Sequence, residues 1–137
     1  GGDINADPDN PIDENGIYST WPQGDRANKN NPYKYEEGTS MATPHVAGAA
    51  AVIRSAFPYM NARQTIETLL TTTTTKGFED EQVFGQGLLN LGVAIEGPGE
   101  FRYAGVFDVD TKGYSSIWSN SISGAGDLTK RGEGALI

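Results

Sequence analysis

The sequence contains no cysteine and only one histidine among its 137 residues. Without cysteine the chain can form no disulfide, no zinc–thiolate site and no thiol nucleophile. The longest apolar stretch, Val46 to Ile53, is far shorter than the roughly 20 residues that a membrane-spanning helix requires. Basic residues are also few, because 10 Lys and Arg stand against 18 Asp and Glu and give a formal charge of −8. This balance argues against nucleic acid as a partner, since phosphate recognition needs a basic surface.

The beginning of the chain lacks the marks of a natural start. Residues 1–5 have neither the basic start nor the apolar centre of a signal peptide, and the chain does not begin with Met. We therefore expect the true amino terminus to lie upstream of Gly1.

Residues 1–37 are predicted to be mainly loop, with a short strand possible at residues 17–21. Pro, Asn and Gly recur there in turn-forming pairs, and the segment holds eight acidic and three basic residues. Clustered carboxylates can bind calcium, but Pro8 and Pro11 interrupt the cluster and its spacing fits no EF-hand. A solvated acidic loop is the favoured interpretation, with calcium as the alternative. The carboxylates concerned are those of Asp3, Asp7, Asp9, Asp13 and Glu14.

Apolar residues recur at three- and four-residue spacing from Ala42 to Phe57, which predicts a helix over residues 42–57. Most other positions in this stretch are also small and apolar, so we expect the helix to be buried on nearly all sides. Pro44 suits the first turn, where its missing N–H costs nothing, and Pro58 ends the helix.

A second helix is predicted over residues 62–70. Asn61 is a favourable N-cap, and Gln64 stands three residues later, where it completes a capping box. The expected apolar stripe consists of Ile66, Leu69 and Leu70. The β-branched run Thr71–Thr75 should end this helix, and Asn90 should cap a short helix that continues to Ile95.

The composition changes after residue 97, where we place a domain boundary. Aromatic and β-branched residues between 101 and 109 and at 117–118 favour strands. The pattern Gly-x-Gly-x-Leu then occurs at residues 124–128 and again at 132–136. This repetition suggests stacked short strands, as in a β-solenoid. Tyr114 and Trp118 are most simply interpreted as packing residues of these strands.

The segment Gly38–Gly48 carries the chemistry of the sequence. It reads Gly38-Thr39-Ser40-Met41-Ala42-Thr43-Pro44-His45-Val46-Ala47-Gly48. A hydroxyl residue is thus placed in a tight turn at the amino end of an apolar helix. Free N–H groups and partial positive charge at such an end favour a developing oxyanion. Ser40 is therefore a candidate nucleophile, although a hydroxyl needs a base to become reactive near neutral pH.

This segment resembles the serine-nucleophile signature of the subtilase family. Residues 33–37 resemble the stretch ahead of that serine, and residues 84–90 resemble the closing Tyr-Gly-x-Gly-x-x-Asn segment of the family. The resemblance implies an α/β fold, with residues 1–97 forming the carboxyl-terminal part of a three-layer subtilisin-like domain. It also implies a serine endopeptidase in which Ser40 is acylated. Ser40 together with Gly38 and Thr39 would then bind the oxyanion and the substrate backbone.

Residues 113–130 resemble the region that follows the protease domain in subtilase autotransporters of Gram-negative bacteria. By that resemblance, residues 98–137 would begin a β-solenoid passenger stem, with an outer-membrane barrel further along that is not part of this sequence. The protein would be secreted or held at the bacterial surface, and it would contact the membrane only through that barrel.

The rest of the catalytic machinery is absent from this sequence. Subtilases place Asp, His and Ser in that order, with an oxyanion-hole Asn between the last two. His45 follows Ser40 by five positions, which is about 140° around a helix axis, so we expect a structural role for it. The upstream part of the same domain is therefore the expected partner, and the isolated chain should be nearly inert towards protein and peptide substrates. No organic cofactor is implied.

Two further alternatives remain open on the sequence alone. Trp21, Tyr33 and Tyr35 would either line a substrate cleft or pack against neighbouring parts of the domain, and packing is favoured. The whole protein would either cleave proteins outside the cytoplasm or be a non-catalytic surface protein on a decayed protease scaffold. In the second case the β-rich stem would be its working part.

Overall fold

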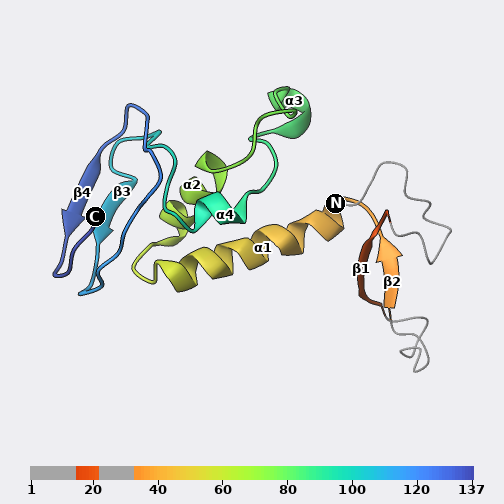
Figure 1. Ribbon diagram of the computed structural model, residues 1–137, viewed down its shortest axis with the longest axis horizontal. Helices are drawn as coiled ribbons and strands as arrows, with labels where there is room; N and C mark the ends of the chain where they lie inside the picture. The colour runs from red at the N-terminus through yellow and green to blue at the C-terminus, as the bar shows by residue number, and fades with distance from the viewer. Residues whose placement is uncertain (1–14, 22–32) are drawn as a thin grey trace. The chain divides into compact units, whose positions relative to one another are not determined.

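The computed structural model describes residues 15–21 and 33–137, so the acidic residues considered for calcium lie outside the described part. The chain divides into two compact units, residues 1–47 and 48–137, and helix α1 (Thr39–Ala56) runs through the division. Helices and strands are mixed, as expected of an α/β protein (Figure 1). No helix of the described residues is long and apolar enough to cross a membrane.

The first unit contains an antiparallel pair of short strands. Strand β1 (Ile17–Thr20) pairs with β2 (Tyr33–Glu36), and the register runs from Ile17 opposite Glu36 to Thr20 opposite Tyr33. The short strand considered at residues 17–21 is thus present, whereas β2 was not predicted. Tyr18 stacks on Tyr33 with ring centroids 5.3 Å apart, and it lies 4.7 Å from the ring of Tyr35. Such cross-strand ring pairs stabilise two-stranded sheets.

Helix α1 begins at Thr39, three residues before the predicted start. Met41 and Ala42 both donate backbone hydrogen bonds to the carbonyl of Gly38, at 3.1 and 3.3 Å, which fixes the start of the helix. The expectation that Pro44 lies in the first turn is therefore wrong, because Pro44 is inside the helix. Its missing N–H removes the hydrogen bond that residue 44 would otherwise donate to the carbonyl of Ser40.

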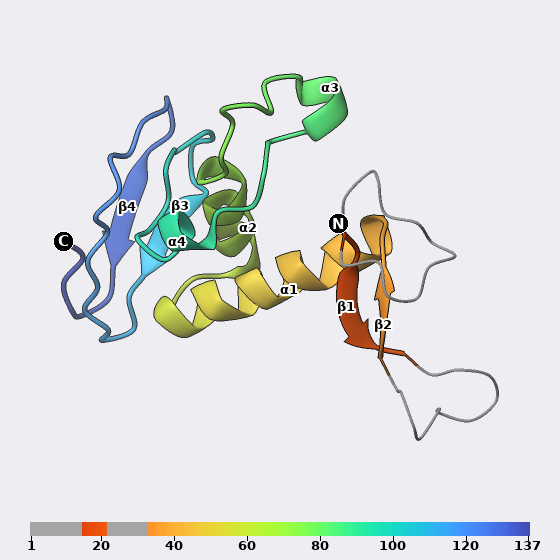
Figure 2. The ribbon, with the colours of Figure 1, turned by 45° about the vertical axis from the view of Figure 1, so that its right-hand side comes forward.

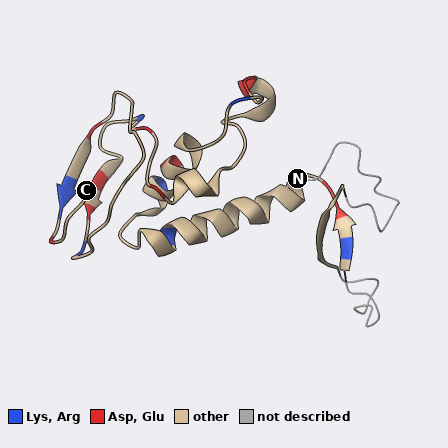
Figure 3. Ribbon diagram, in the orientation of Figure 1, with Lys and Arg blue, Asp and Glu red and all other residues tan. Residues whose placement is uncertain are grey.

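The expectation that this helix is buried on nearly all sides is also wrong for the described structure. Only Ala49 and Ile53 are buried, and these two residues lie one turn apart on a single stripe. Val46 and Val52 are 47% and 43% exposed. Figure 3 shows the helix almost without charge, since Arg54 is its only charged residue. The described elements cover one side of an apolar helix and leave the others uncovered.

The second unit continues with helix α2 (Ala62–Thr71), whose predicted capping box is confirmed. The Asn61 side chain accepts from the Gln64 N–H at 2.9 Å, and the Gln64 side chain accepts from the Asn61 N–H at 3.0 Å. The predicted apolar stripe is largely wrong, because Ile66 is 52% and Leu70 37% exposed. The buried residues of α2 are Gln64, Thr65, Thr68 and Leu69.

Two one-turn helices follow. Helix α3 (Glu81–Phe84), capped by the side chain of Asp80, was not predicted. Helix α4 (Leu91–Ala94) begins as predicted at Asn90, whose side chain accepts from the Val93 N–H at 3.1 Å. Between α2 and α4 the chain returns on itself through a bridge between Thr74 and Leu88.

Within residues 98–137, two segments of the chain pair with each other in parallel. Strand β3 (Phe107–Asp110) pairs in parallel with β4 (Leu128–Arg131), as Figure 2 shows. Two further parallel bridges join Glu100 to Ser123 and Ser116 to Leu136. The strands are shorter than the sequence suggested, and residues 117–118 lie in no named strand. Residues 100–116 therefore lie beside residues 123–136 at three places along their length.

One apolar core holds the second unit together, and residues on both sides of position 97 contribute to it. Trp118 packs edge-on against Phe57 and Phe107, with ring centroids 6.5 and 6.0 Å apart. Its indole N–H donates to the hydroxyl of Tyr59 at 3.1 Å, and Tyr59 also contacts Tyr114 at 6.4 Å. The domain boundary near residue 97 stays a prediction. The buried core consists of Ala49, Ile53, Phe57, Tyr59, Met60, Leu69, Ala94, Val106, Phe107, Val109 and Trp118.

Removing the buried hydrogen bond between Trp118 and Tyr59 should destabilise the second unit. We expect Trp118→Phe and Tyr59→Phe each to lower the free energy of unfolding by about 1–2 kcal/mol or more, because each leaves a polar group buried without its partner. The loss of unfolding free energy in the double variant should be smaller than the sum of the losses in the two single variants, because both substitutions remove the same hydrogen bond. Urea unfolding measures all three, with Tyr103→Phe at an exposed position as the control. Strictly additive losses would contradict this prediction.

Candidate active site

The candidate nucleophile lies at the exposed amino end of helix α1. Ser40 is exposed in the first turn, and Gly38 precedes the helix with a φ of +123°. This φ lies in the region that side-chain-bearing residues rarely adopt, so a glycine is required at this position. The helix has no acidic residue in its first turn that would offset the partial positive charge of its amino end.

The first backbone N–H groups of helix α1 are the candidate oxyanion donors. The first hydrogen bonds of the helix are donated by Met41 and Ala42, so the N–H groups of Thr39 and Ser40 precede them. The first N–H groups of a helix have no acceptor within the helix. The assignment of Gly38, Thr39 and Ser40 to the backbone part of the site stays a prediction.

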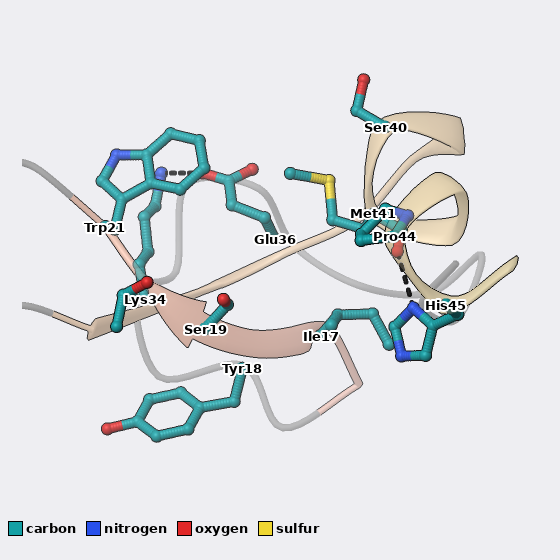
Figure 4. Close-up of a pocket in the computed structure, with 11 residues that line it drawn as sticks. Ile17, Tyr18, Ser19, Trp21, Lys34, Glu36, Ser40, Met41, Pro44 and His45 are labelled. Carbon is teal, nitrogen blue, oxygen red and sulfur yellow. Dashed lines mark hydrogen bonds and ion pairs between the residues drawn. The ribbon is translucent and has the colours of Figure 1, made fainter. Parts of the chain in front are cut away.

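His45 is not placed to act as a base for Ser40. Its Nδ1 atom lies 2.7 Å from the carbonyl oxygen of Met41, one turn earlier in the same helix. That contact makes Nδ1 the donor, because a carbonyl oxygen can only accept. Figure 4 shows the side chains of Ser40 and His45 leaving the helix in opposite directions. His45 is thus a hydrogen-bonded helix residue, as its spacing predicted.

A recess of about 380 Å³ lies beside Ser40 within the first unit. Lys34 is central to it, since its ammonium lies 5.3 Å from the centroid of the Trp21 ring and forms an ion pair with Glu36. The Lys34 and Glu36 side chains are 25% and 18% exposed, so the pair is largely shielded from water. Figure 4 shows Met41 extending from the helix towards this group. The lining residues are Ile17, Tyr18, Ser19, Thr20, Trp21, Lys34, Glu36, Ser40, Met41, Pro44 and His45.

Trp21, Tyr33 and Tyr35, which the sequence analysis considered together, differ in their surroundings. Trp21 lines the recess, whereas Tyr33 and Tyr35 pack on Tyr18. Sequence reasoning missed Lys34 and Glu36 because β2 was not predicted. The signal was available, since Tyr-Lys-Tyr-Glu alternates aromatic and charged residues at the two-residue period of a strand.

No group of three or more His, Asp or Glu side chains that could hold a metal occurs within residues 15–21 and 33–137. One carboxylate of the second unit has a shifted pKa. A hydrogen bond from the Gly77 N–H, at 2.8 Å, lowers the pKa of Glu79 because it stabilises the charged form. Glu79 is on the surface and does not line the recess beside Ser40.

The arrangement is therefore a serine at the head of an apolar helix, with backbone donors beside it and a partly charged recess next to it. Residues 3–88 match the model of the Subtilase family, Peptidase S8. The matched residues make up more than half of the chain. The chain belongs to this family, as the signature around Ser40 indicated.

Individual relatives agree with the family assignment. The chain is 36% identical to an extracellular serine protease of Serratia marcescens over 143 aligned residues, covering 77% of this chain and 14% of that protein. It is 40% identical to the autotransporter lipoprotein NalP of Neisseria meningitidis over 115 residues, covering 81% of this chain and 10% of that protein. Subtilisin DY of Bacillus licheniformis is 42% identical over 80 residues, covering 58% of this chain and 26% of that protein. The chain thus spans about a tenth to a quarter of the length of these relatives.

Substituting Gly38 should disturb the turn that presents Ser40. We expect Gly38→Ala to destabilise the first turn by about 1–3 kcal/mol, because alanine is strained at a φ of +123°. Hydrogen exchange of the amides at residues 39–43 should become faster.

Gly48→Ala is the matched control, since Gly48 lies in the interior of the same helix with open space around it. Alanine there should stabilise the helix by up to about 1 kcal/mol. Unchanged exchange in Gly38→Ala would show that the positive φ is not needed for the turn.

Proposed function

We propose that this chain is the nucleophile-bearing part of a secreted subtilisin-like serine endopeptidase. The observation that carries the proposal is the exposed Ser40, which lies in the first turn of α1 beside a recess and within the residues that match the family. Protein or peptide substrates follow from the family's chemistry. The names of the relatives, an extracellular protease and an autotransporter, support export to the outside of the cell.

In the proposed reaction the hydroxyl oxygen of Ser40 attacks the carbonyl carbon of a peptide bond. A histidine supplied by the upstream part of the domain accepts the hydroxyl proton and passes it to the leaving amine. An upstream aspartate orients that histidine, and the N–H of Ser40, with an upstream Asn, stabilises the oxyanion. Water then hydrolyses the acyl-enzyme. The side chain of His45 leaves α1 in the direction opposite to that of Ser40, so the sole histidine of the chain does not reach the hydroxyl, and the chain alone should be nearly inactive.

Residues 98–137 are proposed to begin a β-solenoid stem. Support comes from the parallel contacts between residues 100–116 and 123–136, whose partners are 20 to 23 positions apart. One turn of a solenoid per 20 or so residues would bring such partners together. No organic cofactor is part of the proposal, and calcium binding by the acidic residues near the amino end stays a prediction.

The serine can be tested directly with a fluorophosphonate probe, which forms a covalent bond only with an activated serine hydroxyl. We expect the full-length protein to be labelled at Ser40 and the Ser40→Ala variant to lose the label. Labelling of the 137-residue chain alone should fall by at least about a thousandfold, because loss of the general base removes most of the activation.

The same experiment separates the proposal from its alternative. The exposed Ser119 serves as a control, since Ser119→Ala should leave the labelling unchanged. A folded full-length protein that is never labelled would instead indicate a non-catalytic surface protein on a decayed protease scaffold.

The recess beside Ser40 should set a preference for uncharged side chains next to the scissile bond. Lys34 and Glu36 neutralise each other, and Trp21 supplies an apolar wall. We expect Glu36→Gln to leave an unpaired ammonium and to raise kcat/KM about fivefold for peptides with an acidic side chain at this position. Lys34→Gln should favour basic side chains by a similar factor.

Cleavage of a peptide series that varies one residue on either side of the bond measures the preference in the full-length protein. Arg131→Gln is the matched control, because it removes a cation from an ion pair elsewhere, with Asp108. Equal specificity in all three variants would show that substrate side chains do not enter the recess.

A further inference from the structure

The buried amide of Gln64 makes more contacts than a helix cap requires. Gln64 is 1% exposed. Its oxygen accepts from the Asn61 N–H, as a capping box needs. Its nitrogen donates to two backbone carbonyls more than 40 residues away, those of Val106 at 3.1 Å and Asp108 at 3.0 Å. Both amide protons and the oxygen are therefore used, and no polar group of this buried side chain is unsatisfied.

The Asp108 carbonyl belongs to strand β3, and the Val106 carbonyl belongs to the residue directly before it. Thr111 donates its N–H to Arg131, so the odd-numbered residues of this segment direct their backbone groups towards β4. Backbone groups alternate in direction along a strand, so residues 106 and 108 direct theirs the other way. A further strand on that side would donate N–H groups to these two oxygens. In the described structure the side-chain amide of Gln64 donates to them instead.

We propose that Gln64 is a side-chain edge cap, which closes the outer edge of the β3–β4 sheet and makes helix α2 and this sheet open as one unit. The inference does not depend on the proteolytic activity of the protein. Two more hydrogen bonds join the end of α2 to the segment that precedes β3, since Gly99 donates to the Thr71 hydroxyl at 3.2 Å and Arg102 donates to the Leu70 carbonyl at 3.2 Å. Gln64 is the buried member of this set.

Substitution by glutamate and by methionine separates an edge cap from an ordinary helix cap. Glutamate keeps the oxygen that accepts from Asn61 but places a carboxylate against two carbonyls. Methionine removes both functions without adding charge. An edge cap predicts the stability order Gln, then Met, then Glu, with the folding equilibrium constant falling on the order of tenfold for methionine and a hundredfold for glutamate. A helix cap alone predicts that glutamate equals glutamine and exceeds methionine, because glutamate is favourable at this position.

Hydrogen exchange of the full-length protein, followed by mass spectrometry, gives the local readout. In both Gln64 variants, exchange should rise together in peptides covering residues 62–72 and 106–111. Faster exchange confined to residues 62–72 would overturn the proposal. Gln82→Glu, an exposed substitution of the same kind on α3, is the control and should change neither peptide.

If Gln64→Glu does not accumulate, the comparison of Gln64→Met with Asn61→Ala still decides. Asn61→Ala removes the helix cap but leaves both bonds from the Gln64 amide to the Val106 and Asp108 carbonyls. Exchange at residues 106–111 should then rise at least about fivefold more in Gln64→Met than in Asn61→Ala. Equal exchange in the two variants would overturn the edge cap.

Discussion

Helix α1 is held at its carboxyl end by an aromatic cluster, and the order of the second unit depends on this packing. Trp118 contacts Phe57, which directly follows the helix, and Phe107, which opens β3. Burial of such large rings provides much of the driving force for folding a small unit. The hydrogen bond from the indole to Tyr59 fixes how the rings meet. Residues from the family-matching part of the chain and from the strands after it thus share one core.

The polar face of α2 follows from what it packs against. Thr65 and Thr68 are buried, as is Gln64, and each has a hydrogen-bond partner. Gln64 meets the carbonyls of Val106 and Asp108, whereas the hydroxyls of Thr65 and Thr68 donate to the Asn61 carbonyl and the Met60 sulfur, close by in the sequence. An apolar stripe would have left the carbonyls of Val106 and Asp108 buried without partners.

Local chemistry in the sequence predicted the parts of the fold that depend on nearby residues. The capping box at Asn61 and the cap at Asn90 involve partners three residues away, so spacing alone identified them. The contact between Gln64 and β3 spans more than 40 residues and leaves no local pattern. Strand β2 was missed because its four residues follow a turn-rich stretch whose composition dominated the interpretation.

The candidate site shows the same division. The hydrogen-bonded helix position of His45 was predictable, because a five-residue offset directs its side chain away from Ser40. The site assignment of Gly38 and Ser40 stays a prediction. The recess was not, because Trp21, Lys34 and Glu36 meet only through the pairing of β1 with β2. The pairing of strands that are separated in the sequence depends on tertiary contacts, which periodicity does not encode.

The uncovered sides of α1 and the missing base have one common explanation in the proposed function. An apolar helix with Val46 and Val52 exposed would gain stability from a partner that covers it. Ser40 would become reactive only with a histidine that this chain does not contain. The proposed upstream part of the domain would supply both the cover for the helix and the histidine. The proposed reactivity of Ser40 and the burial of the apolar helix would then depend on the same upstream contacts, so activity should appear only together with burial of the helix.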